Sequence, residues 1–240
     1  MAIKATSLVK IYDHRTVVNE NTFDVNPGEV VGLLGPNGAG KTTTFYMIVG
    51  LIRPDGGKIE LDGNDVTTMP MHERAKAGIG YLPQETSIFR RLTVEENIKL
   101  VLEMNEKLTD NERKDKLEEL LDDFGIGKLR DVSSVKLSGG ERRRVEIARA
   151  LAASPKYILL DEPFTGIDPI AIQEIQTHIR KLTEKNIGVL ITDHNPKATL
   201  SITDRVNLIF DGKIKISGNS REVADNMEAK KFYLGEDFKL

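Results

Sequence analysis

The hydrophobic pattern of the chain contains short segments that are apolar at nearly every position and are bounded by turn-forming residues. They span Val30–Leu34, Tyr157–Leu160 and Gly188–Thr192. Continuous apolar runs of this length are typical of strands that are buried on both faces of a parallel sheet. Helix-forming segments separate them along the chain. This alternation of strand and helix predicts an α/β fold with a mostly parallel sheet.

Two pairs of segments near the ends of the chain have the composition of antiparallel strands instead. Ile3–Ile11 and Thr16–Val25 are rich in β-branched and apolar residues and are separated by a short polar turn, which predicts an antiparallel edge sheet. Val206–Phe210 and Lys213–Ser217 flank an Asp-Gly pair, a strong signal for a hairpin. The chain then reads as a short polar helix and a tail, and composition alone places the tail in solvent.

The sequence between Leu92 and about Arg130 is charged and helix-forming. Thr109 and Glu112 have the spacing of a capping box, and Gly125 is a candidate helix end. We therefore expect a single domain over residues 1–240, with a helical subdomain at about 92–150 inserted in the α/β core.

The composition excludes several classes of protein. The 240 residues include 34 Lys and Arg against 37 Asp and Glu, so no excess of positive charge supports nucleic-acid binding. The absence of cysteine excludes disulfides, a thiol nucleophile and Cys-ligated metal sites. No apolar run approaches the roughly 18 residues that a membrane-spanning helix needs. We expect a chain that stays in the cytoplasm and does not itself cross a membrane.

A glycine-rich segment directly after the first buried strand matches the pattern G-x-x-x-x-G-K-[ST] of a phosphate-binding loop. Glycines let backbone N–H groups turn inward around phosphate oxygens, the lysine reaches the terminal phosphates, and the last hydroxyl is suited to Mg²⁺. The alternative is a plain glycine turn with an exposed lysine. The residues expected to contact nucleotide here are Gly35, Pro36, Asn37, Gly38, Ala39, Gly40, Lys41, Thr42 and Thr43.

Two acidic residues, Asp161 and Glu162, follow the second buried strand. Ligand groups collect at the carboxyl ends of strands in α/β sheets. One acid can hold Mg²⁺ while the other activates a water for attack on the terminal phosphate. We assign the metal role to Asp161, together with Thr42, and the general-base role to Glu162. A solvated turn is the alternative interpretation of the two acids taken alone.

The segment Leu137-Ser138-Gly139-Gly140-Glu141 separates this chain from phosphate-loop proteins in general. Ser138 and Glu141 form a second capping box, and the two glycines leave the backbone accessible to an anion; a helix cap with no further role is the alternative. With this segment the chain resembles the nucleotide-binding subunits of ABC transporters, whose signature is L-S-G-G-Q. Glu141 departs from that signature at one position.

The resemblance implies roles for four further residues. Gln84 corresponds to the glutamine that touches Mg²⁺ and the attacking water, and His194 to the switch histidine that contacts the γ-phosphate. Tyr12 falls where the family carries an aromatic that stacks on adenine, although a surface tyrosine in a turn is the alternative. Asp168, before a proline that suits the first helical position, corresponds to the aspartate of the D-loop, in a context that departs from the commoner family sequence.

Further segments narrow the resemblance to the ABC ATPases that power lipopolysaccharide export. They are Phe45–Met47, Ser87–Leu92, Glu141–Glu146 and the C-terminal Phe232–Leu240. The other open alternatives are an importer ATPase of this family, such as one for branched-chain amino acids, and a soluble ABC ATPase without a membrane partner. The C-terminal tail discriminates against the importer. The length of the chain, 240 residues with room for one ATPase unit and a short helical insertion, argues against the soluble ATPase.

The segment Phe89-Arg90-Arg91, a phenylalanine followed by two arginines, combines side chains that are common anchors of protein interfaces. In ABC transporters this neighbourhood receives a coupling helix of the membrane subunit. The alternative is a Phe89 partly buried in the helical subdomain beside solvated arginines.

Together these features imply an ATP hydrolase with a RecA-like core that uses ATP and Mg²⁺ and works as a homodimer. In the family, the Ser138 loop of one chain completes the ATP site that the phosphate loop of the other chain forms. We expect integral membrane subunits as partners on the cytoplasmic face of the inner membrane. We expect no contact with nucleic acid or directly with the cargo.

Overall fold

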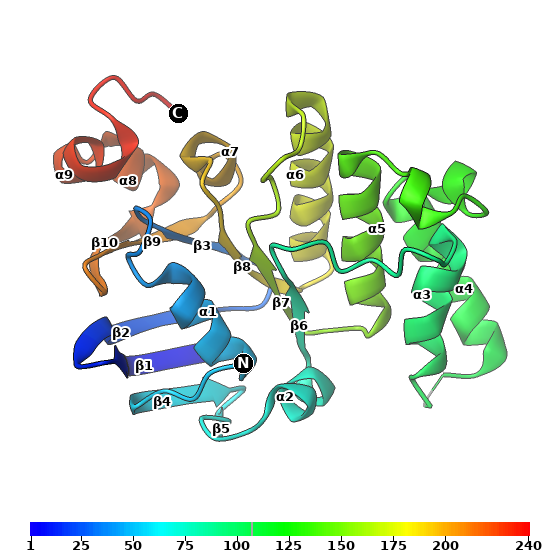
Figure 1. The fold of residues 1–240 in the computed structure, drawn as a ribbon, viewed down its shortest axis with the longest axis horizontal. Coiled ribbons are helices and arrows are strands. Elements are labelled where there is room, and N and C mark those ends of the chain that lie inside the picture. Colours follow the sequence, from blue (N-terminus) through cyan, green and yellow to red (C-terminus); the bar gives the residue numbers. More distant parts are fainter. Residues whose placement is uncertain (107) are drawn as a thin grey trace.

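The computed structural model describes residues 1–106 and 108–240, which fold into two sheets with helices between and around them (Figure 1). Within these residues the larger sheet has the strand order β10-β9-β3-β8-β7-β6. Its members from β9 to β6 are mutually parallel, and β10 pairs antiparallel with β9. The predicted α/β fold with a mostly parallel sheet is confirmed. The strands are β3 (Val30–Leu34), β6 (Ile79–Leu82), β7 (Tyr157–Asp161), β8 (Gly188–Thr192), β9 (Arg205–Phe210) and β10 (Lys213–Asn219).

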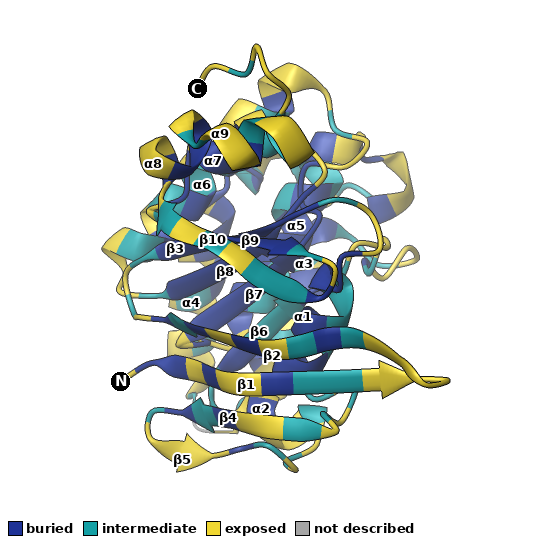
Figure 2. Ribbon diagram, turned by 90° about the vertical axis from the view of Figure 1, so that its left-hand side faces the viewer, coloured by how far each residue is buried: buried dark blue, intermediate teal, exposed yellow. Residues whose placement is uncertain are grey.

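A smaller antiparallel sheet has the order β2-β1-β4-β5 among the described residues. It contains the two expected N-terminal strands, β1 (Ile3–Tyr12) and β2 (Arg15–Val25), followed by β4 (Gly56–Leu61) and β5 (Asn64–Asp65). Strands β3, β7 and β8 of the large sheet are buried at every position, whereas the edge sheet alternates between buried and exposed residues (Figure 2). The difference arises because other elements cover both faces of the large sheet but only one face of the edge sheet.

Two hydrophobic clusters cover the two faces of the large sheet. On one face, Phe45 and Ile48 of helix α1 (Lys41–Val49) pack between Leu33 of the large sheet and residues such as Leu8 of the edge sheet. On the other face, helices α5 (Gly139–Ala152) and α6 (Pro169–Glu184) pack against the sheet through residues such as Ile147. The phosphate-loop helix therefore lies between the two sheets, which fixes its position.

The helical region contains α3 (Val94–Glu103) and α4 (Asp110–Asp123), and it packs on α5 at the side of the molecule away from the edge sheet (Figure 1). The expected capping boxes at Thr109 and at Ser138 are both present. Helix α4 ends at the predicted place, because Gly125 follows its cap with φ +59°. Helix α5 also contacts α6 and β6, so it joins the helical region to the core.

The hairpin between β9 and β10 and several short helical segments complete the fold. Asp211 and Gly212 have φ of +45° and +77°, which is the conformation of a tight hairpin between β9 and β10. The helical segments not yet named are α2 (Met71–Ala77), the short 3-10 turns at Gly127–Leu129 and Ser134–Lys136, α7 (Pro196–Leu200), α8 (Ser220–Asp225), α9 (Met227–Ala229) and a π-turn at Lys230–Leu234. No helix in the described ranges is long and apolar enough to cross a membrane.

The C-terminal tail corrects the expectation that composition alone gave. Tyr233, Leu234 and Phe238 pack against a hydrophobic cluster that includes Leu34 and Leu208. The tail therefore lies against the fold at the end of β3 and β9. A composition average missed this because it does not show which few apolar residues of the tail pack on one cluster.

Candidate active site

The phosphate loop joins β3 to α1, and its shape depends on backbone conformations that only glycine adopts readily. Gly35, Gly38 and Gly40 have φ of +150°, +75° and +100°. A Cβ on Gly35 would lie 2.2 Å from the carbonyl oxygen of Ile209, and one on Gly40 would lie 2.5 Å from that of Val17. A Cβ on Gly38 would meet nothing within 4 Å. The loop is therefore held closely at both ends and open at its middle, as a cradle for an anion requires.

Lys41 at the start of α1 is turned back into this loop. Its ammonium group donates hydrogen bonds to the carbonyl oxygens of Gly35, at 2.7 Å, and Pro36, at 2.9 Å. Burial lowers the pKa of Lys41, while the charges of Glu162 and Asp161 raise it in opposition. A buried ammonium group near two carboxylates and an open backbone cradle can pair with phosphate oxygens.

The carboxylate of Glu162, directly after β7, is the centre of a cluster of polar side chains from separate segments. Gln84 Nε2 donates to Glu162 Oε2 at 2.6 Å, and the hydroxyl of Thr165 donates to the same oxygen at 3.2 Å. His194 Nε2 lies 2.5 Å from Glu162 Oε1. Glu162 also has a φ of +48°, which is costly for a residue with a side chain and is typical of functional sites. Three of the predicted catalytic residues, Gln84, Glu162 and His194, therefore meet at one point.

Asp161 lies beside this cluster at the end of β7 and has a carboxylate oxygen that no other group satisfies. In the part of the chain that the structure describes, its buried Oδ1 has no hydrogen-bond partner, while Oδ2 is 3.4 Å from the hydroxyl of Tyr81. Burial, and secondly the charge of Glu162, raise the pKa of Asp161 to about 6. An orphaned buried carboxylate oxygen is suited to a hard cation such as Mg²⁺, which takes oxygen ligands. The residues present fit the predicted metal site, with Thr42 the second expected ligand.

The residue before His194 has a structural role that sequence reasoning missed. Asp193 is buried, and its carboxylate accepts backbone hydrogen bonds from Phe164 at 2.8 Å and from Asn195 at 2.9 Å. Burial raises the pKa of Asp193, and these two backbone donors lower it in opposition. Asp193 thus ties the loop of His194 to the loop that follows Glu162. A second acid directly before a candidate histidine was the available signal.

The signature segment lies outside the Glu162 cluster. Ser138 caps α5 and accepts a bond from the Glu141 backbone at 3.3 Å, while its hydroxyl and its own N–H donate to Glu141 Oε2 at 2.7 and 2.8 Å. Glu141 therefore performs the capping that a glutamine also performs, which accounts physically for the departure from the family signature. A Cβ on Gly140 would lie 2.5 Å from the Cβ of Ala171, so this glycine allows close packing of α5 on α6.

Asp168 and Tyr12 also occupy separate positions. Asp168 is exposed and caps α6, accepting bonds from the backbone of Ile170 at 3.1 Å and Ala171 at 3.0 Å. Tyr12 ends β1 with 42% of its surface exposed, and the ammonium group of Lys10 lies 5.3 Å from its ring centre. Both have surface available to a ligand or a partner, and their predicted roles stay predictions.

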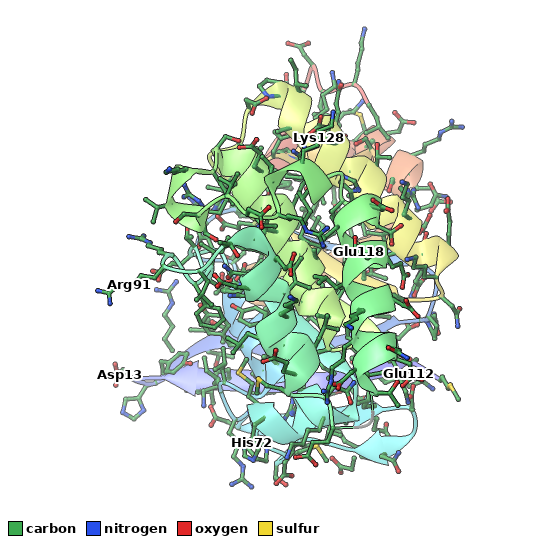
Figure 3. The ribbon with its side chains drawn as sticks, turned by 90° about the vertical axis from the view of Figure 1, so that its right-hand side faces the viewer. Asp13, His72, Arg91, Glu112, Glu118 and Lys128 are labelled. Carbon is green, nitrogen blue, oxygen red and sulfur yellow. The ribbon has the colours of Figure 1, made fainter. Side chains whose placement is uncertain are left out.

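The segment Phe89-Arg90-Arg91 is exposed, with 45% of the Phe89 surface accessible. Arg91 extends away from the protein surface (Figure 3). The guanidinium carbon of Arg149 lies 4.8 Å from the centre of the Phe89 ring, and the Phe89 N–H donates to Asn97 Oδ1 at 2.9 Å. The Phe89 ring is thus half exposed and packs beside Arg149, and its role in docking stays a prediction.

Sequence reasoning missed a buried ion pair that connects this exposed segment to the active site. Arg143 and Glu146 lie in α5 with their charged groups 3.2 Å apart. Glu146 accepts the backbone N–H groups of Ser87, at 2.7 Å, and Ile88, at 3.1 Å. Arg143 donates to the carbonyl oxygens of Pro83 and Asp161, both at 3.0 Å. Their i, i+3 spacing was the available signal, but nothing in the sequence shows that they are buried.

Comparison with known proteins agrees with this geometry. The sequence profile of the ABC transporter family matches residues 18–165. The chain is 55% identical over 238 residues to the lipopolysaccharide export system ATP-binding protein LptB of Haemophilus influenzae, covering 99% of both chains. It is 51% identical over 238 residues to LptB of Escherichia coli K12, again covering 99% of both.

Solved structures give the same result for the fold. An ATP-binding cassette of an ABC transporter in its ADP conformation superposes with a TM-score of 0.87 at 28% identity, over 98% of this chain and 100% of that one. A dimeric bacterial ABC transporter cassette superposes with a TM-score of 0.80 at 26% identity, over 91% and 99% of the two chains. From its sequence profile, its relatives and its fold, the chain belongs to the ABC transporter family of transport-coupled ATPases.

Proposed function

We propose that this chain is the ATP-hydrolysing subunit of a transporter that exports lipopolysaccharide from the inner membrane. The observation that carries the catalytic part is the position of Glu162, whose carboxylate lies between Gln84 and His194 and beside the orphaned oxygen of Asp161. The observation that supports the cargo is the identity of 51–55% to relatives named for lipopolysaccharide export.

In the proposed reaction, the backbone of the phosphate loop and the ammonium group of Lys41 bind the phosphates of ATP. Lys41 exchanges its bonds to the Gly35 and Pro36 carbonyl oxygens for bonds to phosphate oxygens. Glu162 accepts a proton from a water whose oxygen attacks the γ-phosphorus. The bond to the bridging oxygen breaks, and ADP and phosphate leave. His194 and Gln84 orient the water and the γ-phosphate.

Thr42, Asp161 and Gln84 are the residues that would hold Mg²⁺ in this reaction. The ion, when bound, neutralises charge on the phosphates. The fit rests on the buried, unpartnered Oδ1 of Asp161 at the end of β7. The side chain of Gln84 already contacts Glu162, which supports its second assignment, to the position of the attacking water.

We also propose an ATP-dependent homodimer. The exposed Ser138 loop and Asp168 are available to the nucleotide and to the second chain, and Tyr12 is available to adenine. One of the superposed cassettes is named as dimeric. In this arrangement two ATP molecules lie between the chains, and hydrolysis removes the γ-phosphate that both chains contact.

The partner site for the membrane subunits is the exposed segment Phe89-Arg90-Arg91. A coupling helix seated on Phe89 would press on a segment that Glu146 holds through its backbone. The paired Arg143 contacts the carbonyl oxygens next to Gln84 and Glu162. Movement of the docked helix would then change the geometry of the catalytic side chains. The chain would lie on the cytoplasmic face of the membrane through these partners.

A replacement experiment tests the proposed function. In Escherichia coli cells depleted of their own LptB, the parent chain should restore growth and carry lipopolysaccharide-transport membrane proteins through purification. Glu162→Gln should be expressed equally but should not restore growth. If the parent chain hydrolyses ATP, yet fails to restore growth and instead purifies with an amino-acid importer, the assignment of cargo is wrong.

A further inference from the structure

The hydroxyl group of Tyr233 is buried in the described structure without a hydrogen-bond partner of ordinary geometry. Tyr233 lies in the π-turn Lys230–Leu234, in the tail that packs beside α8 and over the β9 and β10 end of the large sheet (Figure 1). The hydrophobic cluster beneath the tail includes Leu34, the last residue before the phosphate loop. The tail therefore contacts the fold directly behind the phosphate loop.

Two groups of the active site influence the pKa of this hydroxyl. Burial raises the pKa of Tyr233 to about 12; the backbone N–H of Gly35 partly opposes this rise, and the negative charge of Asp193 adds to it. Tyr233 is therefore a neutral phenol at physiological pH, able to donate one hydrogen bond and accept others. Gly35 begins the phosphate loop, and Asp193 immediately precedes His194.

The surroundings of these two groups connect the hydroxyl to the reaction. The carbonyl oxygen of Gly35 accepts the 2.7 Å hydrogen bond from Lys41, so Gly35 contacts the lysine of the phosphate loop directly. Each Asp193 oxygen accepts one backbone bond, which leaves further acceptor capacity on the carboxylate. Tyr233 thus lies on the cluster that includes Leu34, before the loop of Lys41, and the pKa of its hydroxyl responds to Asp193, beside the loop of His194.

A buried hydroxyl without a partner destabilises the fold, so phenylalanine at this position would give a more stable protein. Buried polar groups are nearly always paired, and an exception points to a strained or functional site. A second arrangement of the active site in which the hydroxyl is paired accounts for the tyrosine. Lys41 leaving the Gly35 carbonyl for phosphate, as proposed above, would free the Gly35 segment to produce that arrangement.

We propose that Tyr233 is a positioning residue of the ATPase: with nucleotide bound, its hydroxyl accepts the Gly35 N–H and donates to the Asp193 carboxylate. The tail then holds the phosphate loop and the His194 loop at one separation. This inference rests on the proposed ATP hydrolysis and adds the tail to its machinery. Through the Tyr233 hydroxyl, the C-terminal segment affects the turnover of ATP. The packing of its apolar side chains alone would not have this effect.

The test is the substitution Tyr233→Phe in the full-length protein, which keeps the ring and removes the hydroxyl. We expect kcat for ATP hydrolysis to fall about tenfold with a change of less than threefold in KM, because the bonds form in the closed catalytic arrangement. The melting temperature without nucleotide should stay the same or rise. Tyr157→Phe is the matched control, because it removes a hydroxyl bonded to Asp62 at 2.8 Å. That control should lower stability and leave kcat unchanged.

Three results are decisive. A Tyr233→Phe protein with kcat and KM within twofold of the parent would overturn the proposal. A lower melting temperature with a parallel loss of activity would also overturn it, since the hydroxyl would then have only a structural role. If the parent protein itself hydrolyses no ATP under conditions in which it binds ATP, the proposed function fails, and that result is recognised before any Tyr233 variant is measured.

Discussion

The phosphate loop and the Glu162 cluster lie at the ends of strands of one sheet, but different parts of the polypeptide build them. The loop is shaped by backbone, with Gly35, Gly38 and Gly40 all at positive φ. The cluster is shaped by side chains that meet from distant segments, with Gln84 and His194 on either side of Glu162. A site made of backbone is sensitive to an added Cβ, whereas a site made of side chains is sensitive to the loss of one functional group.

The two regions also differ in how they are stabilised before nucleotide binds. Lys41 is satisfied by the carbonyl oxygens of its own loop. Among the described residues, Asp161 has a carboxylate oxygen without a hydrogen-bond partner and a raised pKa, so its charge is not fully compensated. The phosphate loop is therefore formed in advance, while the carboxylate side of the site is stabilised further only when a cation binds.

The largest expected effect is on the side-chain region. Glu162→Gln should bind ATP but hydrolyse it at least about a hundredfold more slowly, because the amide cannot accept the proton from water. Turnover of the purified protein measures this effect. Thr165→Val is a matched control: it removes only the 3.2 Å bond to Glu162 and should keep most of the activity. Hydrolysis by Glu162→Gln within threefold of the parent would remove Glu162 from this role.

The same variant tests the proposed dimer. Glu162→Gln cannot complete the reaction, so ATP should accumulate between two chains and produce a dimer at micromolar concentration. Light scattering with ATP and without nucleotide measures the change in mass. A protein that remains monomeric with ATP bound, both alone and with its membrane subunits, contradicts the composite site.

The backbone region can be tested with a pair of identical substitutions. Gly35→Ala places a Cβ 2.2 Å from the Ile209 carbonyl oxygen, and Gly38→Ala places one where nothing lies within 4 Å. We expect Gly35→Ala to lower the free energy of unfolding by about 2–4 kcal/mol, from strain and overlap together. Gly38→Ala should cost about 1 kcal/mol, from its positive φ alone. Urea unfolding without nucleotide compares them, and equal costs would show that the close contact at Gly35 does not constrain the loop.

The exposed segment Phe89-Arg90-Arg91 is a third region to compare, and substitution of Phe89 tests whether docking depends on its side chain. Phe89→Ala should weaken association with the membrane subunits by roughly 2 kcal/mol, the scale of an interface anchor, with little change in melting temperature, because the ring is 45% exposed. Leu100→Ala, at 39% exposure on α3, is the control and should associate normally. Normal association of Phe89→Ala together with a clearly destabilised fold would show that the ring contributes to packing instead.

The comparison also explains how much the sequence could predict. The phosphate loop was predictable, because its glycines, Lys41 and the strand before them are contiguous and their spacing carries the geometry. The grouping of Gln84, Glu162 and His194 required the family resemblance, because nothing local joins residues so far apart. The Arg143–Glu146 pair and the Tyr233 hydroxyl were not predictable, because their importance comes from burial and from long-range packing.

The smallest expected effect tests the electrostatic difference between the two regions. The pKa of Asp161 in the folded protein, about 6, lies above the ordinary aspartate value of 3.8, so the folded state binds the proton more tightly than the unfolded chain does. This contribution to stability is complete below about pH 4 and is lost as the pH rises through 6. Asp161→Asn should therefore match the parent at low pH. Above pH 6 it should be more stable by roughly 1–2 kcal/mol, less than the full pKa difference corresponds to, because solvent partly screens the charge. Melting curves without nucleotide or Mg²⁺ measure the difference.

Asp65→Asn is the control of opposite sign, because hydrogen bonds from Thr67 lower the pKa of Asp65. An Asp161→Asn protein less stable than the parent at pH 8 would show that the orphaned carboxylate is compensated even before a cation binds.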